Sequence, residues 1–317
     1  MKKWFGLVLV GLLIAALAAC SGNEGTSGDG GDVDPDAYKV GLAMNTLNNP
    51  FFVDLKEGAE ETAKAEGINL IVSDSQGDPG KQMSEVENLL QQDLDLLILN
   101  PVDSDAVAQA VKLANDKDVP VITVDRQANG GEVVSHIGFD ALKSGTIAAT
   151  YLDEELNGSG KVVEIQGILG TNVGRDRSKG FNDYMGDVED IEIIAKQSAN
   201  FDRGEALTVM EDILQANKDI DAVYAANDEM AMGALSAIDA AGRLDEIKLI
   251  GTDAIDPAQD AIREGRMSAT IAEPPYFLGR DSVKTAIKVM DGESVEEMIL
   301  LENTLVTKDN VDEVKTR

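Results

Sequence analysis

The sequence predicts an α/β protein with two lobes, each built on a parallel β-sheet that helices cover on both faces. From Tyr38 onwards, short apolar runs alternate with longer amphipathic stretches, which is the pattern of repeated strand–helix units. The chain has 317 residues, of which 43% are apolar, enough for two domains with full cores. The alternation runs through two rounds of five strands, so we expect two sheets.

The predicted elements follow one another in a regular order. In the first half the strands are YKVGLAM, INLIVSD, DLLILN, PVITVD and VVSHIGF, and helices are expected near residues 50–66, 79–92, 104–118 and 140–156. In the second half the strands are KVVEIQG, IEIIAKQ, DAVYAAN, IKLIGTD and MSATIAE, with helices near 174–186, 203–217, 228–241, 256–265 and 276–291. Glycines that suit a left-handed cap follow four of these helices: Gly67, Gly242, Gly265 and Gly292.

Residues 1–19 have the order of a secretory signal segment. Two lysines follow Met1, and the uncharged stretch after them is shorter than the ~20 residues of a membrane-spanning helix. The four residues LAAC, which end at Cys20, resemble the lipobox of bacterial lipoproteins. That resemblance implies that the cysteine is acylated and becomes the new N-terminus. An ordinary signal segment followed by a chance cysteine is the alternative.

Residues 20–37 are expected to form a flexible acidic tether behind the lipidated cysteine. The stretch from 21 to 36 contains five glycines and five acidic residues, and Val33 is its only large apolar residue. Such a segment cannot bury enough surface to fold. Anchor, tether and folded body together predict a protein that works just outside a membrane.

Charge and composition exclude several classes of function. The formal net charge of −31 argues against a nucleic-acid partner, because that affinity comes largely from Lys and Arg that neutralise phosphates. The only cysteine and the only histidine, Cys20 and His136, cannot form an intrachain disulfide or the usual zinc site. The sequence has neither a GxxxxGK[ST] loop nor a GxSxG motif. We therefore expect no metal and no cofactor, and a structural role for His136.

Polar side chains follow five of the predicted strands at their carboxyl ends. They are Asn100, Asp125 with Arg126, Asn227 with Asp228, Thr252 with Asp253, and Glu273. Ligands of open α/β sheets bind beyond these ends of the strands, so the five sets predict one polar cleft between two lobes. Each residue alone could instead cap the helix that follows it, as Asn227 or Asp253 would.

The side chains expected in this cleft suit a neutral ligand with many hydroxyl groups. Carboxylates accept hydrogen bonds, Arg126 donates them and asparagines such as Asn49 do both, which matches the hydroxyl groups of a sugar. The rings of Phe51, Phe52 and Phe201 are flat apolar surfaces for the C–H faces of a sugar ring. Core packing at a helix start is the alternative for these rings.

Most of residues 38–306 resembles the family of periplasmic ribose-binding proteins, the sugar-binding components of bacterial ABC importers. The segments that carry the resemblance are TLNNPFF, DSQGDP, LNPVDSDAV, VITVDRQA with GEVVSHI, EIQGILGT, FDR, ANDEMAMGAL and ATIA. The resemblance implies the class I periplasmic-binding-protein fold, in which a three-strand hinge joins two Rossmann-like lobes. One lobe would hold residues 38–139 and 274–302, and the other residues 140–273 and 303–317.

The same resemblance implies a set of ligand-binding residues: Asn49, Phe51, Phe52, Asn100, Asp125, Arg126, Arg177, Phe201, Asn227 and Asp253. Arg175 is the competing choice for Arg177. Three further positions depart from the family pattern. Asn45 stands where a small hydroxyl residue is usual, Thr252 where an aromatic is usual, and Glu273 where an amide is usual. We expect Thr252 and Glu273 to set which sugar is preferred.

The resemblance implies a monomeric binding protein, not an enzyme, that captures a monosaccharide between its lobes, closes by hinge motion and delivers the sugar to an ABC permease. Ribose is the first choice, and another pentose or a small hexose of the xylose, allose or galactose type is the alternative. A sensor that presents its closed form to a membrane receptor would have the same body. A repressor of the LacI type would need an N-terminal helix-turn-helix. A sugar-modifying enzyme could use Asp125 and Glu273 as paired carboxylates.

Overall fold

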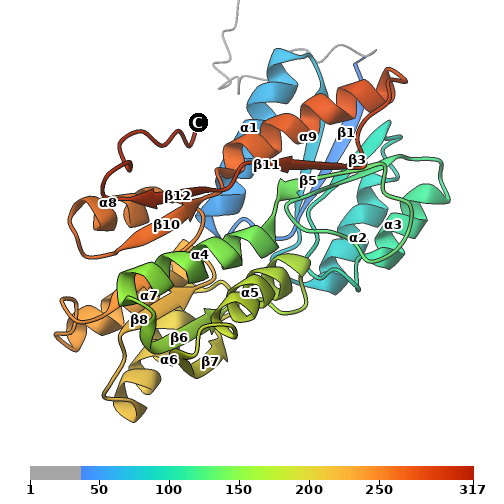
Figure 1. The fold of residues 1–317 in the computed structure, drawn as a ribbon. Coiled ribbons are helices and arrows are strands. Elements are labelled where there is room, and N and C mark those ends of the chain that lie inside the picture. Colours follow the sequence, from blue (N-terminus) through green and yellow to red (C-terminus); the bar gives the residue numbers. More distant parts are fainter. Residues whose placement is uncertain (1–36) are drawn as a thin grey trace, which may run out of the picture. The chain divides into compact units, whose positions relative to one another are not determined.

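A computed structural model describes residues 37–317 of the chain (Figure 1). The predicted signal segment, Cys20 and all of the predicted tether except residue 37 lie outside the described residues. Within the described residues, two sheets of six strands alternate with helices along the chain. The predicted α/β fold class with two lobes is therefore confirmed.

The first sheet organises what we call the N-terminal lobe. Its strands lie in the order β11-β5-β4-β3-β1-β2, and all neighbouring pairs are parallel. The strands are β1 (Lys39–Met44), β2 (Asn69–Asp74), β3 (Leu96–Leu99), β4 (Val121–Val124), β5 (Ser135–Phe139) and β11 (Met298–Leu301). The helices are α1 (Pro50–Ala65), α2 (Pro79–Leu89), α3 (Ala108–Asn115) and α9 (Pro275–Met290).

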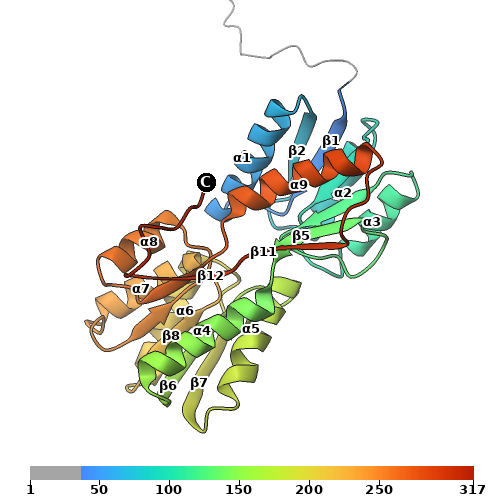
Figure 2. The same ribbon diagram turned by 45° about the horizontal axis from the view of Figure 1, so that its top comes forward.

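Helices cover both faces of this sheet because its central strands are apolar on both sides. Leu96 and Ile98 of β3 pack with Leu278 of α9 and with α1. Leu97 and Leu99 alternate with them and pack against α2 and α3 on the opposite face. Figures 1 and 2 show α1 and α9 side by side along the same face.

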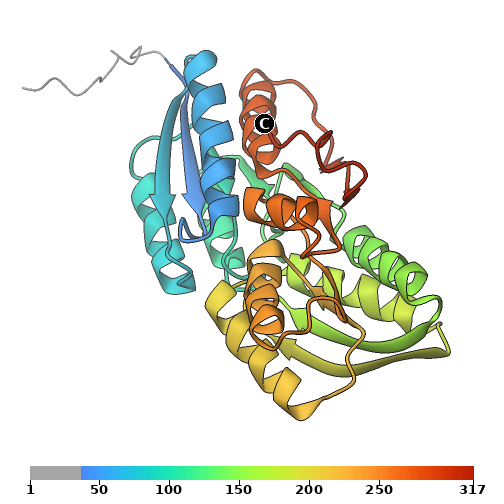
Figure 3. The ribbon, with the colours of Figure 1, turned by 90° about the vertical axis from the view of Figure 1, so that its left-hand side faces the viewer.

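The second sheet organises the C-terminal lobe, with the strand order β12-β10-β9-β8-β6-β7. The strands are β6 (Ser159–Gln166), β7 (Asp190–Ser198), β8 (Ala222–Ala225), β9 (Lys248–Ile250), β10 (Ala269–Ala272) and β12 (Thr304–Thr307). The helices are α4 (Ala141–Leu156), α5 (Asn172–Met185), α6 (Arg203–Ala216), α7 (Asp228–Ala240) and α8 (Asp256–Arg263). Figure 3 shows the pairs α4–α5 and α6–α7 on opposite faces of the sheet.

The chain passes between the two sheets three times, which is the predicted three-strand hinge. The first crossover is Asp140, between β5 and α4. The second is Glu273 with Pro274, between β10 and α9, and the third is Glu302 with Asn303, between β11 and β12. Each lobe is therefore assembled from segments that are distant in the sequence.

The structure differs from the sequence prediction in three elements. Helix α3 begins at Ala108 instead of residue 104, because the Asp103 carboxylate accepts hydrogen bonds from the backbone N–H groups of Asp105 and Ala106 and holds a turn there. Strands β11 and β12 were not among the predicted strands, and β12 pairs with β10 in the antiparallel direction.

Among the described residues, no helix has the length and apolar character needed to cross a membrane.

Candidate functional site

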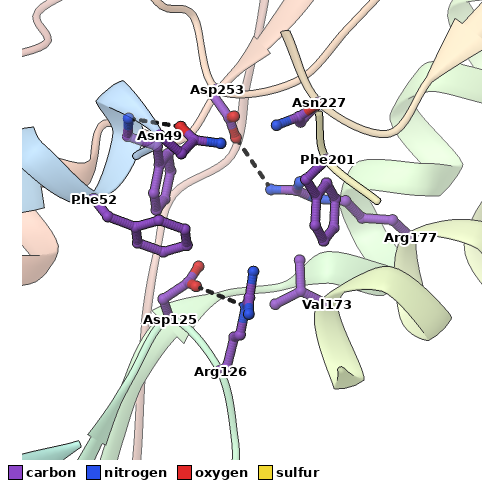
Figure 4. A pocket seen from close by; sticks show the side chains of 10 residues that line it. Asn49, Phe52, Asp125, Arg126, Val173, Arg177, Phe201, Asn227 and Asp253 are labelled. Atoms are coloured by element: carbon purple, nitrogen blue, oxygen red, sulfur yellow. Dashed lines mark hydrogen bonds and ion pairs between the residues drawn. The ribbon is translucent and has the colours of Figure 1, made fainter. Parts of the chain in front are cut away.

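A cavity of about 300 Å³ lies beyond the carboxyl ends of the strands and takes its walls from both lobes (Figure 4). The N-terminal lobe contributes Asn49, Phe51, Phe52, Asp125 and Arg126, and the C-terminal lobe contributes Val173, Arg177, Phe201, Asn227 and Asp253. Every one of these residues except Val173 is a site residue predicted from the sequence. The fold thus brings the polar strand ends and the phenylalanine rings together around one cavity.

Two asparagines in the cavity wall also cap helices. Asn49 Oδ1 accepts a hydrogen bond from the backbone N–H of Phe51 (2.9 Å) at the start of α1. Asn227 Oδ1 accepts one from the backbone N–H of Met230 (3.0 Å) at the start of α7. The capping and the lining roles therefore coexist. Capping uses only the oxygen of each amide and fixes the side chain, so the amide nitrogen keeps a defined place at the cavity.

Three residues of the cavity wall adopt left-handed backbone conformations. The φ angles are 62° for Asp125, 60° for Phe201 and 119° for Asp253. Such values are uncommon for residues other than glycine and carry a conformational cost that is often found at ligand sites. Asp125 comes directly after β4 and Asp253 comes three residues after the end of β9, where the chain turns at the cavity.

Arg126 lies between aromatic rings from the two lobes. Its guanidinium carbon is 5.2 Å from the ring centre of Phe52 and 5.7 Å from that of Phe201, within the range of cation–π attraction. Its Nη1 donates hydrogen bonds to the backbone carbonyls of Pro101 (3.1 Å) and Val102 (3.3 Å). These bonds fix the guanidinium, so the rings and Arg126 form a rigid wall.

Arg177 projects into the cavity from α5. Its Nη1 donates to the backbone carbonyl of Ala226 (2.7 Å), and its Nη2 pairs with Asp253 Oδ1 (3.4 Å) and with Glu273 Oε2. Arg175, the competing choice, is exposed and donates to a nearby backbone carbonyl. The geometry therefore places Arg177 and not Arg175 at the cavity.

Burial dominates the electrostatics of the cavity. Loss of solvation raises the pKa of Asp125 and raises the pKa of Asp253 well above its usual range, although nearby arginines oppose both shifts. Burial also lowers the pKa of Arg126. It acts in the same direction on Arg177, but Glu273 and Asp253 outweigh it and raise the pKa of that guanidinium. Perturbed titrating groups gathered in one cleft are typical of functional sites.

Four predicted site residues do not line the cavity: Asn45, Asn100, Thr252 and Glu273. All four are at most 2% exposed. Asn100 Nδ2 donates to Asp125 Oδ2 (3.3 Å) and to the backbone carbonyl of Val124 (3.0 Å), so it supports the cavity wall from behind. Asn45 donates its backbone N–H to Asn100 Oδ1 (3.3 Å). The four side chains thus lie outside the lining of this cavity, and their contact with a ligand stays a prediction.

Sequence reasoning missed Val173 and the contacts around it. Val173 lies in the first turn of α5, one helical turn before Arg177, so its side chain shares the face of that residue. Next to it, Asn172 Oδ1 accepts a hydrogen bond from the backbone N–H of Gln127 (2.9 Å) in the N-terminal lobe. An apolar residue at a helix start carries no chemical signal, and only the spacing to Arg177 could have indicated it.

Close relatives of this chain are known in several bacteria. The ribose import binding protein of Escherichia coli (strain K12) is 44% identical over 269 residues, which cover 85% of this chain and 90% of that protein. The ribose import binding protein of Bacillus subtilis (strain 168) is 40% identical over 305 residues, which cover 94% and 97% of the two chains. The predicted resemblance is therefore confirmed by long matches.

Solved structures share the fold. An ABC transporter solute-binding protein from Bacillus halodurans C-125 with bound myo-inositol has a TM-score of 0.84 and 32% identity, covering 88% of this chain and 98% of that one. The corresponding protein from Actinobacillus succinogenes 130z with bound D-allose has a TM-score of 0.83 and 30% identity, covering 87% and 100%. The model of the periplasmic binding protein domain matches residues 40–294. This chain therefore belongs to the periplasmic binding protein family.

Proposed function

We propose that this protein is an extracytoplasmic solute-binding lipoprotein that captures a monosaccharide, with D-ribose as the first choice, and delivers it to an ABC permease. The observation that carries the proposal is the cavity itself, which combines carboxylates, guanidinium groups, amides and phenylalanine rings from both lobes. Relatives with 40–44% identity that are named for ribose import support the choice of sugar.

The chemistry of the cavity wall matches the two kinds of surface that a sugar presents. Hydroxyl groups donate to the carboxylates of Asp125 and Asp253 and accept from Arg126 and Arg177. The ring of Phe52 offers an apolar face to C–H groups. The charges within the described cavity wall are balanced, because two carboxylates face two guanidinium groups. A neutral ligand with many hydroxyl groups is therefore favoured over a phosphate or a carboxylate.

The division of the cavity between two lobes supports capture by closure. A ligand that contacts both lobes binds the closed form more tightly than the open form, and this difference shifts the population. The closed arrangement of lobe surfaces is then the form that a membrane permease would bind. A receptor that senses the same closed form remains the alternative, and the genes that flank this one distinguish the two roles.

A thermal-shift screen tests the proposed ligand. The full chain is heated with D-ribose, D-xylose, D-allose, D-galactose or myo-inositol at matched concentrations. A ligand that binds only the folded state stabilises it by RT ln(1 + [L]/Kd), which is about 2.7 kcal/mol at 100 times Kd. We expect the largest rise in Tm with D-ribose, and unchanged sugar after incubation. A larger rise in Tm with another sugar of the panel would make that sugar the proposed ligand in place of ribose. No rise in Tm with any of the sugars would reject sugar capture.

The anchor is a separate part of the proposal and rests on the sequence alone. The LAAC segment places Cys20 directly after a signal-like stretch. We expect the mature protein to begin with an acylated Cys20 and to partition with membranes, and Cys20→Ser to release it or stall its processing. Mass spectrometry of the mature N-terminus tests this. An unmodified first residue other than Cys20 would contradict the anchor without affecting sugar binding.

A further inference from the structure

Glu273 is a buried carboxylate at the point where the three crossovers meet. It belongs to the second crossover and is 2% exposed. Its Oε1 accepts hydrogen bonds from Ser144 Oγ and from Asn303 Nδ2, the latter at 2.7 Å. Asn303 belongs to the third crossover, and Ser144 lies in the first turn of α4, directly after the first crossover. One carboxylate oxygen therefore receives donors from the third crossover and from the helix that follows the first.

The donors around Glu273 are also bonded to one another. Asn303 Nδ2 donates to Ser144 Oγ (2.8 Å), and the single hydroxyl proton of Ser144 is directed either at Glu273 Oε1 or at the backbone carbonyl of Asp140 in the first crossover (3.2 Å). Ser144 is fully buried and Asn303 is 6% exposed. Hydrogen bonds to a charged group in such a dry place are stronger than those between neutral groups. The network therefore joins the second and third crossovers directly and reaches the first through Ser144 at the start of α4.

The second oxygen of Glu273 connects this network to the cavity. Oε2 pairs with Nη2 of Arg177, whereas Asp253 Oδ1 lies 3.4 Å from the same nitrogen. Glu273 thus lies nearer to the guanidinium group of Arg177 than Asp253 does. It leaves the carboxylate of Asp253, which lines the cavity, as an acceptor for ligand hydroxyl groups. Glu273 does not line the cavity itself.

We propose that Glu273 is a positioning residue that couples the ligand cavity to the hinge. Its Oε2 holds Arg177 in place, and its Oε1 holds the three crossovers in the geometry seen here. The inference rests on the proposed capture of a ligand between the lobes. The negative charge matters because a glutamine of the same size accepts at one end only and gives Arg177 a neutral partner.

Glu273→Gln tests the coupling, and Glu164→Gln is the matched control. Glu164 is also a fully buried carboxylate of the C-terminal lobe, and it accepts hydrogen bonds from Asn182 Nδ2 (2.8 Å) and Gln166 Nε2 (3.4 Å). It is neither in a crossover nor at the cavity. Two measurements are made on the full chain. Hydrogen exchange reports the opening of the crossovers without ligand, and calorimetry reports the affinity for D-ribose.

We expect Glu273→Gln to speed amide exchange at residues 139–144, 272–278 and 301–305 together, and to change the affinity for D-ribose about tenfold, which corresponds to ~1.4 kcal/mol. Glu164→Gln should change neither quantity. Ser144→Ala removes one donor to Oε1 without touching the cavity. Ser144→Ala should speed amide exchange at the same three segments to a smaller extent. This variant tests the proposal if Glu273→Gln does not fold.

Unchanged exchange at the crossovers would overturn the proposal, whether or not D-ribose binds. Weaker ribose binding with unchanged exchange would also overturn it, because Glu273 would then act as a ligand contact alone. If the wild-type chain does not bind D-ribose but exchange at the three crossovers still rises in Glu273→Gln, the choice of sugar fails and the link of Glu273 to the hinge stands.

Discussion

Asp125 is held from several sides by protein groups. Asn100 donates to its Oδ2 from the buried side (3.3 Å), and Nε of Arg126 lies 3.6 Å from the same oxygen. The left-handed backbone at Asp125 turns the chain directly after β4. A side chain fixed in this way loses little further entropy when a ligand binds, so its hydrogen bonds contribute more fully to affinity.

Asp125→Asn is expected to remove useful sugar binding while the fold remains. Asparagine tolerates the left-handed backbone but replaces a charged acceptor in a buried pair with Arg126. Truncation of one partner of such a pair commonly costs ~2–5 kcal/mol, roughly 30-fold or more in affinity. Calorimetry with the cognate sugar measures the loss, and Asp183→Asn, on the exposed side of α5, is the control. An affinity within threefold of that of the wild type would show that Asp125 does not contact the ligand.

Asp228 should make the stability of the protein depend on pH. Its carboxylate is fully buried and accepts hydrogen bonds from Thr270 Oγ1 (2.7 Å) and from the backbone N–H of Ile255 (3.1 Å). Burial raises its pKa from 3.8 to about 7. Between pH 4 and pH 7 the folded state therefore keeps a proton that the unfolded chain has released. The free energy of unfolding falls as pH rises through this window, by about 4 kcal/mol for this group.

Asp228→Asn should flatten this part of the stability profile. Urea unfolding at pH 4.5, 5.5 and 7.0 gives the slope for the wild type and the variant. The raised pKa of Asp253 acts in the same direction and persists in the variant, so we expect a smaller slope and not a flat profile. Equal slopes in the two proteins would show that Asp228 does not titrate in this window.

Helices α4 and α5 approach each other through glycines. A Cβ atom on Gly145 of α4 would meet the backbone carbonyl of Arg177, and one on Gly180 of α5 would meet the backbone carbonyl of Leu142. Backbone atoms cannot turn away as the end of a side chain can. Since α5 carries Arg177 and Val173, this close contact between helices sets how far both residues reach into the cavity.

Gly145→Ala is expected to push α5 away from α4. Overpacking of this kind costs roughly 1–3 kcal/mol of stability, and the displaced Arg177 should also weaken sugar binding. Gly186→Ala at the end of α5 is the control, because its backbone is helical with φ −66° and alanine suits it. Denaturant unfolding and calorimetry are the measurements. Equal stability of the two variants would mean that the helices can separate without cost.

The two lobes contact each other beside the cavity. Ser104 donates its backbone N–H to the carbonyl of Gly170 (3.1 Å), and the Ser104 hydroxyl accepts from the backbone N–H of Asn172 (3.1 Å). These contacts between lobes, like that of Gln127 with Asn172, are hydrogen bonds between polar groups. A ligand that adds hydrogen bonds to both walls can therefore decide the balance between open and closed forms.

Closure should be visible as a smaller radius of gyration. Small-angle scattering of the full chain is recorded with and without saturating cognate sugar, and we expect the radius to fall on saturation because the lobes rotate together about the crossovers. Asp125→Asn should show no change at the same sugar concentration. A radius that stays constant while calorimetry shows binding would reject hinge closure and leave sugar capture intact.

The fold class could be predicted because its signal is local. Each strand is a short apolar run and each helix has its own periodic pattern, so the alternation is visible in one pass along the chain. Strands β11 and β12 were not predicted, because their sequences carry no such local signal. Met298 and Leu300 of β11 are exposed, and this short edge strand is defined by its pairing with β5, which lies far away in the sequence.

The sequence by itself also determined which strand ends meet, since polar residues after parallel strands gather at one edge. The tertiary structure decided how deep each of them lies. Asp253 lines the cavity, whereas its neighbour Thr252 is fully buried behind it. Glu273 directly follows β10 as Asp125 directly follows β4, yet donors from α4 and from the third crossover surround it. Depth depends on which distant segments pack around a side chain, and those contacts exist only after the chain has crossed three times between its lobes.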